Sequence, residues 1–60
     1  MTKITEHKTG AWTVFEKLPS GMYMVKLYAS NGDLRDKVRC DDYANARSYL
    51  KSFNLIAKNS

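Results

Sequence analysis

The sequence has little of what small proteins use for crosslinking, metal binding or membrane insertion. It contains one cysteine, one histidine and one proline among its 60 residues. The single cysteine, Cys40, excludes a disulfide within one chain, and no cysteine, histidine or carboxylate cluster has metal-ligand spacing. No apolar run approaches the about 20 residues of a membrane-spanning helix. We therefore expect no metal, no cofactor, no membrane contact and a cytoplasmic location.

Catalytic arrangements are missing as well. No set of residues supplies a nucleophile, a base and an orienting group together. Cys40 falls at an inward strand position, which is typical of a small buried hydrophobic residue rather than a nucleophile. The three glycines are isolated from one another, so they form no phosphate-binding loop. We expect a protein that is not an enzyme and has no small-molecule substrate.

What the sequence does have is apolar residues and positive charge. Hydrophobic residues make up 43% of the chain, and ten lysines and arginines against six acids give a net charge of +4. This composition is typical of a folded domain, although so short a chain buries only about 60% of its unfolded surface. The charge favours anionic partners.

The Asn31-Gly32 pair lies between two alternating segments and predicts a tight hairpin. Both central residues of a two-residue type I′ turn need positive φ, which asparagine and glycine tolerate best. The hairpin fixes which residues face each other across the two strands. The expected pairs are Tyr28 with Arg35, Lys26 with Lys37, Val25 with Val38, and Met24 with Arg39.

The whole chain is predicted to be an α+β protein in which a three-stranded antiparallel meander packs on one C-terminal helix. The strands are expected at about 11–18, 22–29 and 34–40, and the helix at about 42–54, with an extension to 57 left open. Its apolar stripe should cover one face of the sheet. Residues 1–10 are expected to be a flexible N-terminal tail, and 11–60 a single βββα domain.

The connector between the first two strands leaves their register open. A four-residue loop pairs Val14 with Leu27 and turns Trp12 inward. A three-residue loop slips the pairing by one residue and turns Phe15 inward, because neighbouring side chains point to opposite faces. We select the first register, since it gives the more apolar inner face.

With this register, the solvent face of the sheet carries five cations and no acid. Lysine and arginine side chains meet phosphates, and aromatic rings stack on bases. The sequence therefore predicts a small non-enzymatic nucleic-acid-binding domain, with DNA preferred. The expected nucleic-acid-binding residues are Lys17, Lys26, Tyr28, Arg35, Lys37 and Arg39.

The same face also fits a protein contact, because exposed methionines and aromatic rings adapt to partner surfaces. The residues concerned are Phe15, Met22, Met24 and Tyr28. The alternative function is a small adaptor or inhibitor, of viral or mobile-element type, that docks on an acidic surface of a larger host protein. A third interpretation is plain solvation, since antiparallel sheets commonly have one polar face. A monomer or a homodimer through a sheet edge is compatible with either function.

Four parts of the sequence carry a resemblance to known DNA-binding domains. They are the central strand at 21–27, the Asn31-Gly32 turn, the basic segment at 35–39, and Ala44, Ala46 and Tyr49 in the helix. In this pattern the chain resembles the DNA-binding domain of plant ethylene-response factors and the arm-binding domains of tyrosine recombinases. The resemblance implies duplex DNA in contact with the outer sheet face, through Lys26, Tyr28, Arg35, Lys37 and Arg39.

Overall fold

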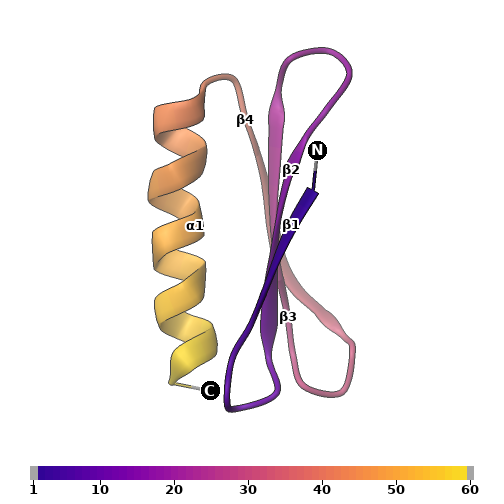
Figure 1. Cartoon of the computed structure of the whole chain (residues 1–60), viewed down its shortest axis with the longest axis vertical. Coiled ribbons are helices and arrows are strands. Elements are labelled where there is room, and N and C mark those ends of the chain that lie inside the picture. The colour runs from indigo at the N-terminus through magenta and orange to yellow at the C-terminus, as the bar shows by residue number, and fades with distance from the viewer. Residues whose placement is uncertain (1, 60) are drawn as a thin grey trace.

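A computed structural model describes residues 2–59 and shows an antiparallel sheet with one helix lying along one face (Figure 1). Met1 and Ser60 lie outside the described residues. The α+β class with a C-terminal helix is confirmed, but the described sheet has four strands in the order β1-β2-β3-β4, not three. The elements are β1 Thr2–Glu6, β2 Trp12–Lys17, β3 Tyr23–Tyr28, β4 Leu34–Cys40 and α1 Tyr43–Lys58.

All three hairpins close with the same kind of turn, and each turn ends in one of the chain's three glycines. In every turn the glycine N–H donates to the carbonyl three residues earlier. The glycines have φ between +91° and +94°, a region in which other residues are strained. The glycines are equally spaced along the sequence, so the chain reverses direction at regular intervals. The pairs, each at 2.9 Å, are Gly10 with His7, Gly21 with Leu18, and Gly32 with Ala29.

The turn at Asn31-Gly32 differs from the expected type I′ turn. Only Gly32 has a positive φ there, and no described residue other than glycine does. The Asn31 side chain explains this, because its Oδ1 accepts a hydrogen bond from the Asp33 N–H at 3.0 Å. This local bond favours an asparagine with ordinary φ.

The different turn changes one of the four predicted pairs between β3 and β4. A bulge between Leu27 and Tyr28 absorbs one residue, so Tyr28 faces Leu34, not Arg35. The other three pairs are confirmed: Lys26 with Lys37, Val25 with Val38, and Met24 with Arg39.

The register selected for β2 and β3 is wrong by one residue. Phe15 pairs with Val25, so Phe15 and Thr13 face the helix while Trp12 and Val14 face away. We selected the register by the number of apolar residues on the inner face, and this criterion overlooked that a polar residue such as Thr13 can be buried when its hydroxyl is hydrogen-bonded. Its hydroxyl donates to Oδ1 of Asn54 at 2.6 Å, and Thr13 is the one fully buried polar side chain among residues 2–59.

The expected N-terminal tail is wrong for residues 2–6, which form β1. Ile4 lies opposite Val14 in the ladder with β2. The turn that follows is tied to the end of α1, where the Thr9 hydroxyl donates to the Ala57 carbonyl at 2.6 Å. His7 Nε2 lies 3.1 Å from Asn54 Oδ1. These contacts attach the first hairpin to the C-terminal half of the helix.

Helix α1 begins after Asp42, whose side chain accepts a hydrogen bond from the Asn45 N–H at 2.8 Å. It continues past Asn54 to Lys58 because Ala57 is fully buried against the sheet. The helix packs on β2, β3 and β4. The buried core consists of Ala11, Val25, Leu27, Cys40, Ala46, Phe53 and Ala57.

Candidate nucleic-acid interface

The sheet face turned away from α1, here called the outer face, carries most of the side chains predicted to bind a partner. Directly opposed residues in an antiparallel ladder share a face, so the observed register defines its rows. The middle row runs Ile4, Val14, Lys26, Lys37, and the row on one side runs Glu6, Trp12, Tyr28, Leu34. The third row runs Thr2, Glu16, Met24, Arg39.

Three cations gather on the β3–β4 half of the outer face. Lys26 and Lys37 lie directly opposite each other, and Arg39 is the next outward residue of β4. Lys37 and Arg39 are exposed, and Lys26 is half-buried. Like charges held opposite each other are unfavourable, and a bound anion relieves the repulsion. This half of the outer face is therefore suited to phosphate.

An aromatic pair lies beside the cations. The rings of Trp12 and Tyr28 are stacked, with centroids 5.2 Å apart and an angle of 13° between their planes. Tyr28 was predicted at this position, whereas Trp12 was missed because the expected register turned it inward. Its signal in the sequence was the competing register, which turns Phe15 inward and Trp12 outward.

We expected no acid on the outer face, but the structure places two there. Glu6 and Glu16 lie on its β1–β2 half, opposite Trp12 and Met24. The one-residue slip of β2 accounts for Glu16, and the unexpected strand β1 accounts for Glu6. The suitable surface for an anion is therefore limited to the β3–β4 half.

The structure brings together five of the predicted site residues and separates the others. Those on the outer face are Met24, Lys26, Tyr28, Lys37 and Arg39. Phe15 and Lys17 lie on the helix side of the sheet. Arg35 is exposed beside the bulge, and Met22 precedes β3, where its carbonyl accepts the Leu18 N–H at 2.8 Å.

Cys40 lies opposite Tyr23 on the helix side and is 6% exposed, as its inward position predicted. Burial raises the pKa of its thiol, and the nearby carboxylates of Asp42 and Asp41 raise it further. The thiol therefore stays protonated at neutral pH, which is the opposite of what a nucleophile needs. Across residues 2–59, no three His, Cys, Asp or Glu side chains come close enough to hold a metal ion.

The fold and the outer face together define a small two-layer α+β protein with one open sheet face, basic on one half. Comparison with protein-family models, with curated proteins and with solved structures finds no match for this chain. Within the described residues, α1 is too short and too polar to cross a membrane.

Proposed function

We propose that this protein binds nucleic acid through the β3–β4 half of its outer face. The observation that carries the proposal is the direct opposition of Lys26 and Lys37, with Arg39 beside them, on a face that no element of residues 2–59 covers. Phosphate contacts position a nucleic acid without reading its sequence. The aromatic pair Trp12 and Tyr28, next to these cations, offers ring contacts to a base.

Single-stranded nucleic acid fits this surface best. Sheets that bind single strands combine aromatic rings for stacking with nearby cations, and here Lys26 and Lys37 lie in the row next to Trp12 and Tyr28. The resemblance to duplex-binding domains favours the alternative in which the sheet enters a major groove. We place the binding in the cytoplasm, consistent with Cys40 being a free thiol.

Titration with oligonucleotides at two salt concentrations tests the proposal. Trp12 is the chain's one tryptophan, so its fluorescence reports on the outer face alone. With three phosphate contacts, the logarithm of the affinity should fall with the logarithm of salt at a slope of about −2 for a single strand and about −3 for a duplex. The variant Lys37→Gln should weaken binding to every sequence and make the slope shallower by about 1.

The matched control is Lys51→Gln, which removes the same charge from an exposed position on α1. It should leave the affinity and the slope nearly unchanged. Absence of binding to any strand at low salt, or an affinity independent of salt, would eliminate the proposed function.

Docking on a larger protein is the second candidate, because apolar side chains also lie on the outer face. Ile4 is 60% exposed and Leu34 is 47% exposed. Val14 lies opposite Ile4, and Met24 lies on the same face, opposite Arg39. An adaptor or inhibitor of viral type would bury these residues first. Replacing Ile4 or Leu34 by threonine should then harm binding more than Lys37→Gln does. A partner that stays bound after nuclease treatment of a lysate would favour this function.

A further inference from the structure

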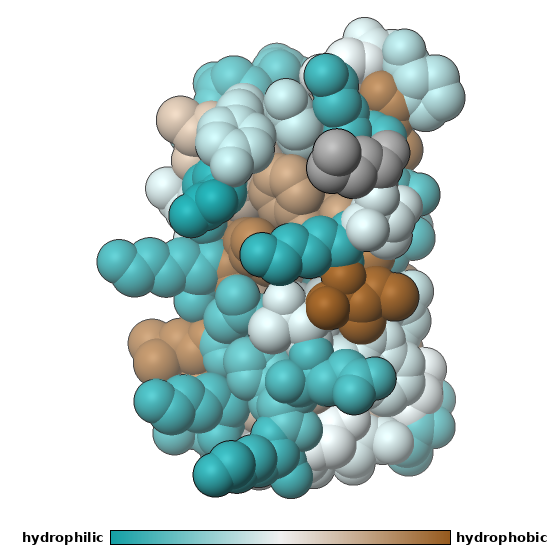
Figure 2. Space-filling model, viewed as in Figure 1, coloured by the Kyte–Doolittle hydropathy of each residue, from teal (hydrophilic) through white to brown (hydrophobic). Residues whose placement is uncertain are grey.

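A cavity of about 290 Å³ opens on the helix side of the sheet, between the first turns of α1 and strands β1 to β3. Helix α1 packs on β2, β3 and β4, and the cavity lies beside this contact, on the side of β1. Figure 2 shows apolar side chains between the helix and the sheet on this side of the molecule, with hydrophilic side chains around them. The volume lies near the lower end of the range for small-molecule sites, about 300 to 1,000 Å³.

Three aromatic rings form the walls of this cavity. The ring centroids of Phe15, Tyr23 and Tyr43 lie 5.6 to 5.9 Å apart from one another. Their planes meet at 43° to 78°, so the rings form a cup rather than a closed stack. Leu50 of α1 completes the lining. A cup of ring faces and edges is suited to a flat apolar group.

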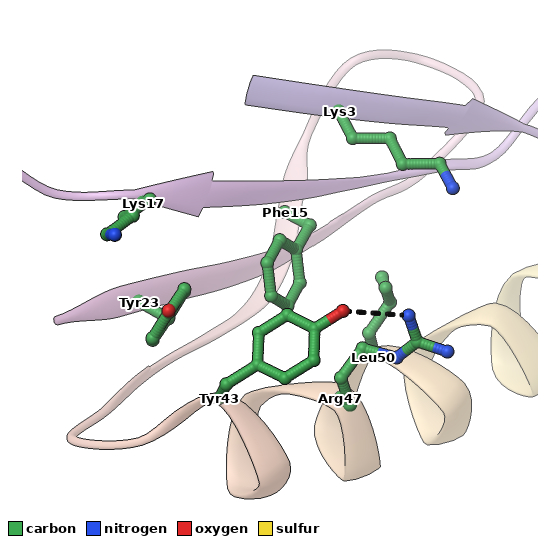
Figure 3. A pocket seen from close by; sticks show the side chains of 7 residues that line it. All are labelled: Lys3, Phe15, Lys17, Tyr23, Tyr43, Arg47 and Leu50. Atoms are coloured by element: carbon green, nitrogen blue, oxygen red, sulfur yellow. Dashed lines mark hydrogen bonds between the residues drawn. The ribbon is translucent and has the colours of Figure 1, made fainter. Parts of the chain in front are cut away.

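Three cations, each from a different element, surround the cup. Lys3 of β1, Lys17 of β2 and Arg47 of α1 line the cavity, and no aspartate or glutamate does among the described residues. In Figure 3, Lys3 and Arg47 lie at one end of the rings and Lys17 at the other. The field inside the cavity is therefore positive, which excludes cationic ligands and attracts anions.

Arg47 is held in place by the cavity wall. Its Nη1 donates to the Tyr43 hydroxyl at 3.1 Å, and its guanidinium carbon lies 5.7 Å from the centroid of the same ring (Figure 3). One of the five N–H donors of the guanidinium is used in this bond. The remaining donors can form a two-pronged contact with an oxyanion in the cavity.

We infer that this cavity, the aromatic-basic pocket, binds a small molecule that combines one planar ring with one oxyanion, such as a phosphate or carboxylate. The ring lies in the cup, and the oxyanion meets Arg47 and Lys3, which lie at the same end of the rings. Two residues expected on the outer face, Phe15 and Lys17, belong to this pocket instead. The inference does not depend on the proposed function, because the two surfaces lie on opposite sides of the sheet.

Amide NMR titration with phenyl phosphate tests the inference. We expect saturable shifts centred on Phe15, Tyr43 and Arg47, with a dissociation constant on the order of 1 mM for so small a ligand. Inorganic phosphate has the charge alone and benzyl alcohol has the ring alone. Each should bind about tenfold more weakly or worse, because each leaves half of the pocket unused. Benzoate in place of phenyl phosphate shows which oxyanion is preferred.

Two variants of exposed residues, one in the pocket and one outside it, distinguish binding in the pocket from a general effect of the protein's charge. Arg47→Gln should weaken phenyl phosphate binding about tenfold by removing the guanidinium contacts. Lys51→Gln removes a charge from an exposed position of α1 that does not line the pocket, and should leave it unchanged. Amide spectra of both variants also report whether the fold is kept, and Lys3→Gln provides a second pocket variant.

Three results would overturn the inference: no saturable binding, equal binding of benzyl alcohol, or an unchanged affinity in folded Arg47→Gln and Lys3→Gln. Failure here is distinguishable from failure of the proposed function. Nucleic acid binding is read from Trp12 fluorescence and depends on Lys37, whereas the pocket is read from the amides around Tyr43.

Discussion

At the scale of single residues, Gly10 differs from the other two turn glycines. A Cβ added at Gly10 would lie 2.8 Å from the Cβ of Ser30, which belongs to the turn between β3 and β4. A Cβ at Gly21 or Gly32 would meet nothing within 4 Å, although all three glycines have nearly the same φ. The first and third turns therefore touch, and Gly10 is the residue that permits it.

Alanine at these glycines should separate backbone strain from steric conflict. Gly32→Ala is expected to lower the free energy of unfolding by about 1 kcal/mol, because of its left-handed φ. Gly10→Ala should cost about 2 to 3 kcal/mol, since the contact with Ser30 adds to the strain. Urea unfolding measures both.

Removing the Ser30 side chain provides the control. In a Ser30→Gly background, the cost of Gly10→Ala should fall to that of Gly32→Ala. Equal costs for the two alanine variants in the unmodified chain would show that the turns do not press on each other.

The raised pKa of Cys40 makes a second prediction at this scale. Burial and the carboxylates of Asp42 and Asp41 make the folded state hold the thiol proton more tightly than the unfolded state does. The contribution to stability is complete below pH 9.0, the ordinary pKa of the thiol. It is lost as the pH rises from there toward the raised value.

Urea midpoints between pH 7 and 10 check this prediction. Lysines and tyrosines also titrate at the alkaline end, so the comparison is with Cys40→Ala. The unmodified protein should lose stability more steeply above pH 9.0 than Cys40→Ala does, whatever the difference between them at pH 7. Parallel pH profiles would contradict the assigned cause.

At the scale of elements, the helix could be predicted from the sequence and the first strand could not. The stripe through Ala46, Leu50, Phe53 and Ala57 follows helical spacing, and three of the four are buried. Strand β1 has one large apolar residue, Ile4, which is 60% exposed. Backbone pairing with β2 therefore supplies the stability of β1, and a hydropathy pattern carries no information about such pairing.

Deleting Thr2–Glu6 tests whether β1 is part of the fold or a dispensable tail. Loss of its pairing with β2 should cost about 2 kcal/mol, which corresponds to a fall in melting temperature of roughly 10 °C. The control is Ile4→Thr, which keeps the backbone and should change the melting temperature by only a few degrees. Thermal unfolding followed by circular dichroism measures both, and an unchanged melting temperature in the deletion would identify β1 as dispensable.

The second error at this scale has a different physical origin. Counting apolar residues favoured Trp12 and Val14 as the inner residues of β2, because Thr13 is polar. Asn54, 41 residues further along the chain, supplies the hydrogen bond that lets Thr13 be buried. A partner so distant in sequence has no local signature, so the register could not be decided from β2 and its neighbour alone.

At the scale of the whole molecule, the one-residue slip in β2 divides the positive charge between two surfaces. Lys26, Lys37 and Arg39 stay on the outer face in either register, because their pairing depends only on β3 and β4. This part of the candidate site was therefore predictable. Phe15 and Lys17 move with β2 to the aromatic-basic pocket, which also needs Lys3 and Arg47 from elements outside the predicted sheet.

The two edges of the sheet leave the oligomeric state open to a direct measurement. Among the described strands, β1 and β4 each pair on one side only. A homodimer through a sheet edge stays a prediction. Sedimentation at several protein concentrations would reveal it.

The attachment of the first hairpin to the C-terminal half of α1 fixes the position of β1 relative to the helix. His7 and Thr9 contact Asn54 and Ala57 of the helix. In Figure 1 the first hairpin turn lies near the C-terminal end of α1. Lys3 of β1 and Tyr43 at the start of α1 line the aromatic-basic pocket. The size of a ligand in the pocket is therefore limited by the separation between a short edge strand and the helix, and not by the packing of the core.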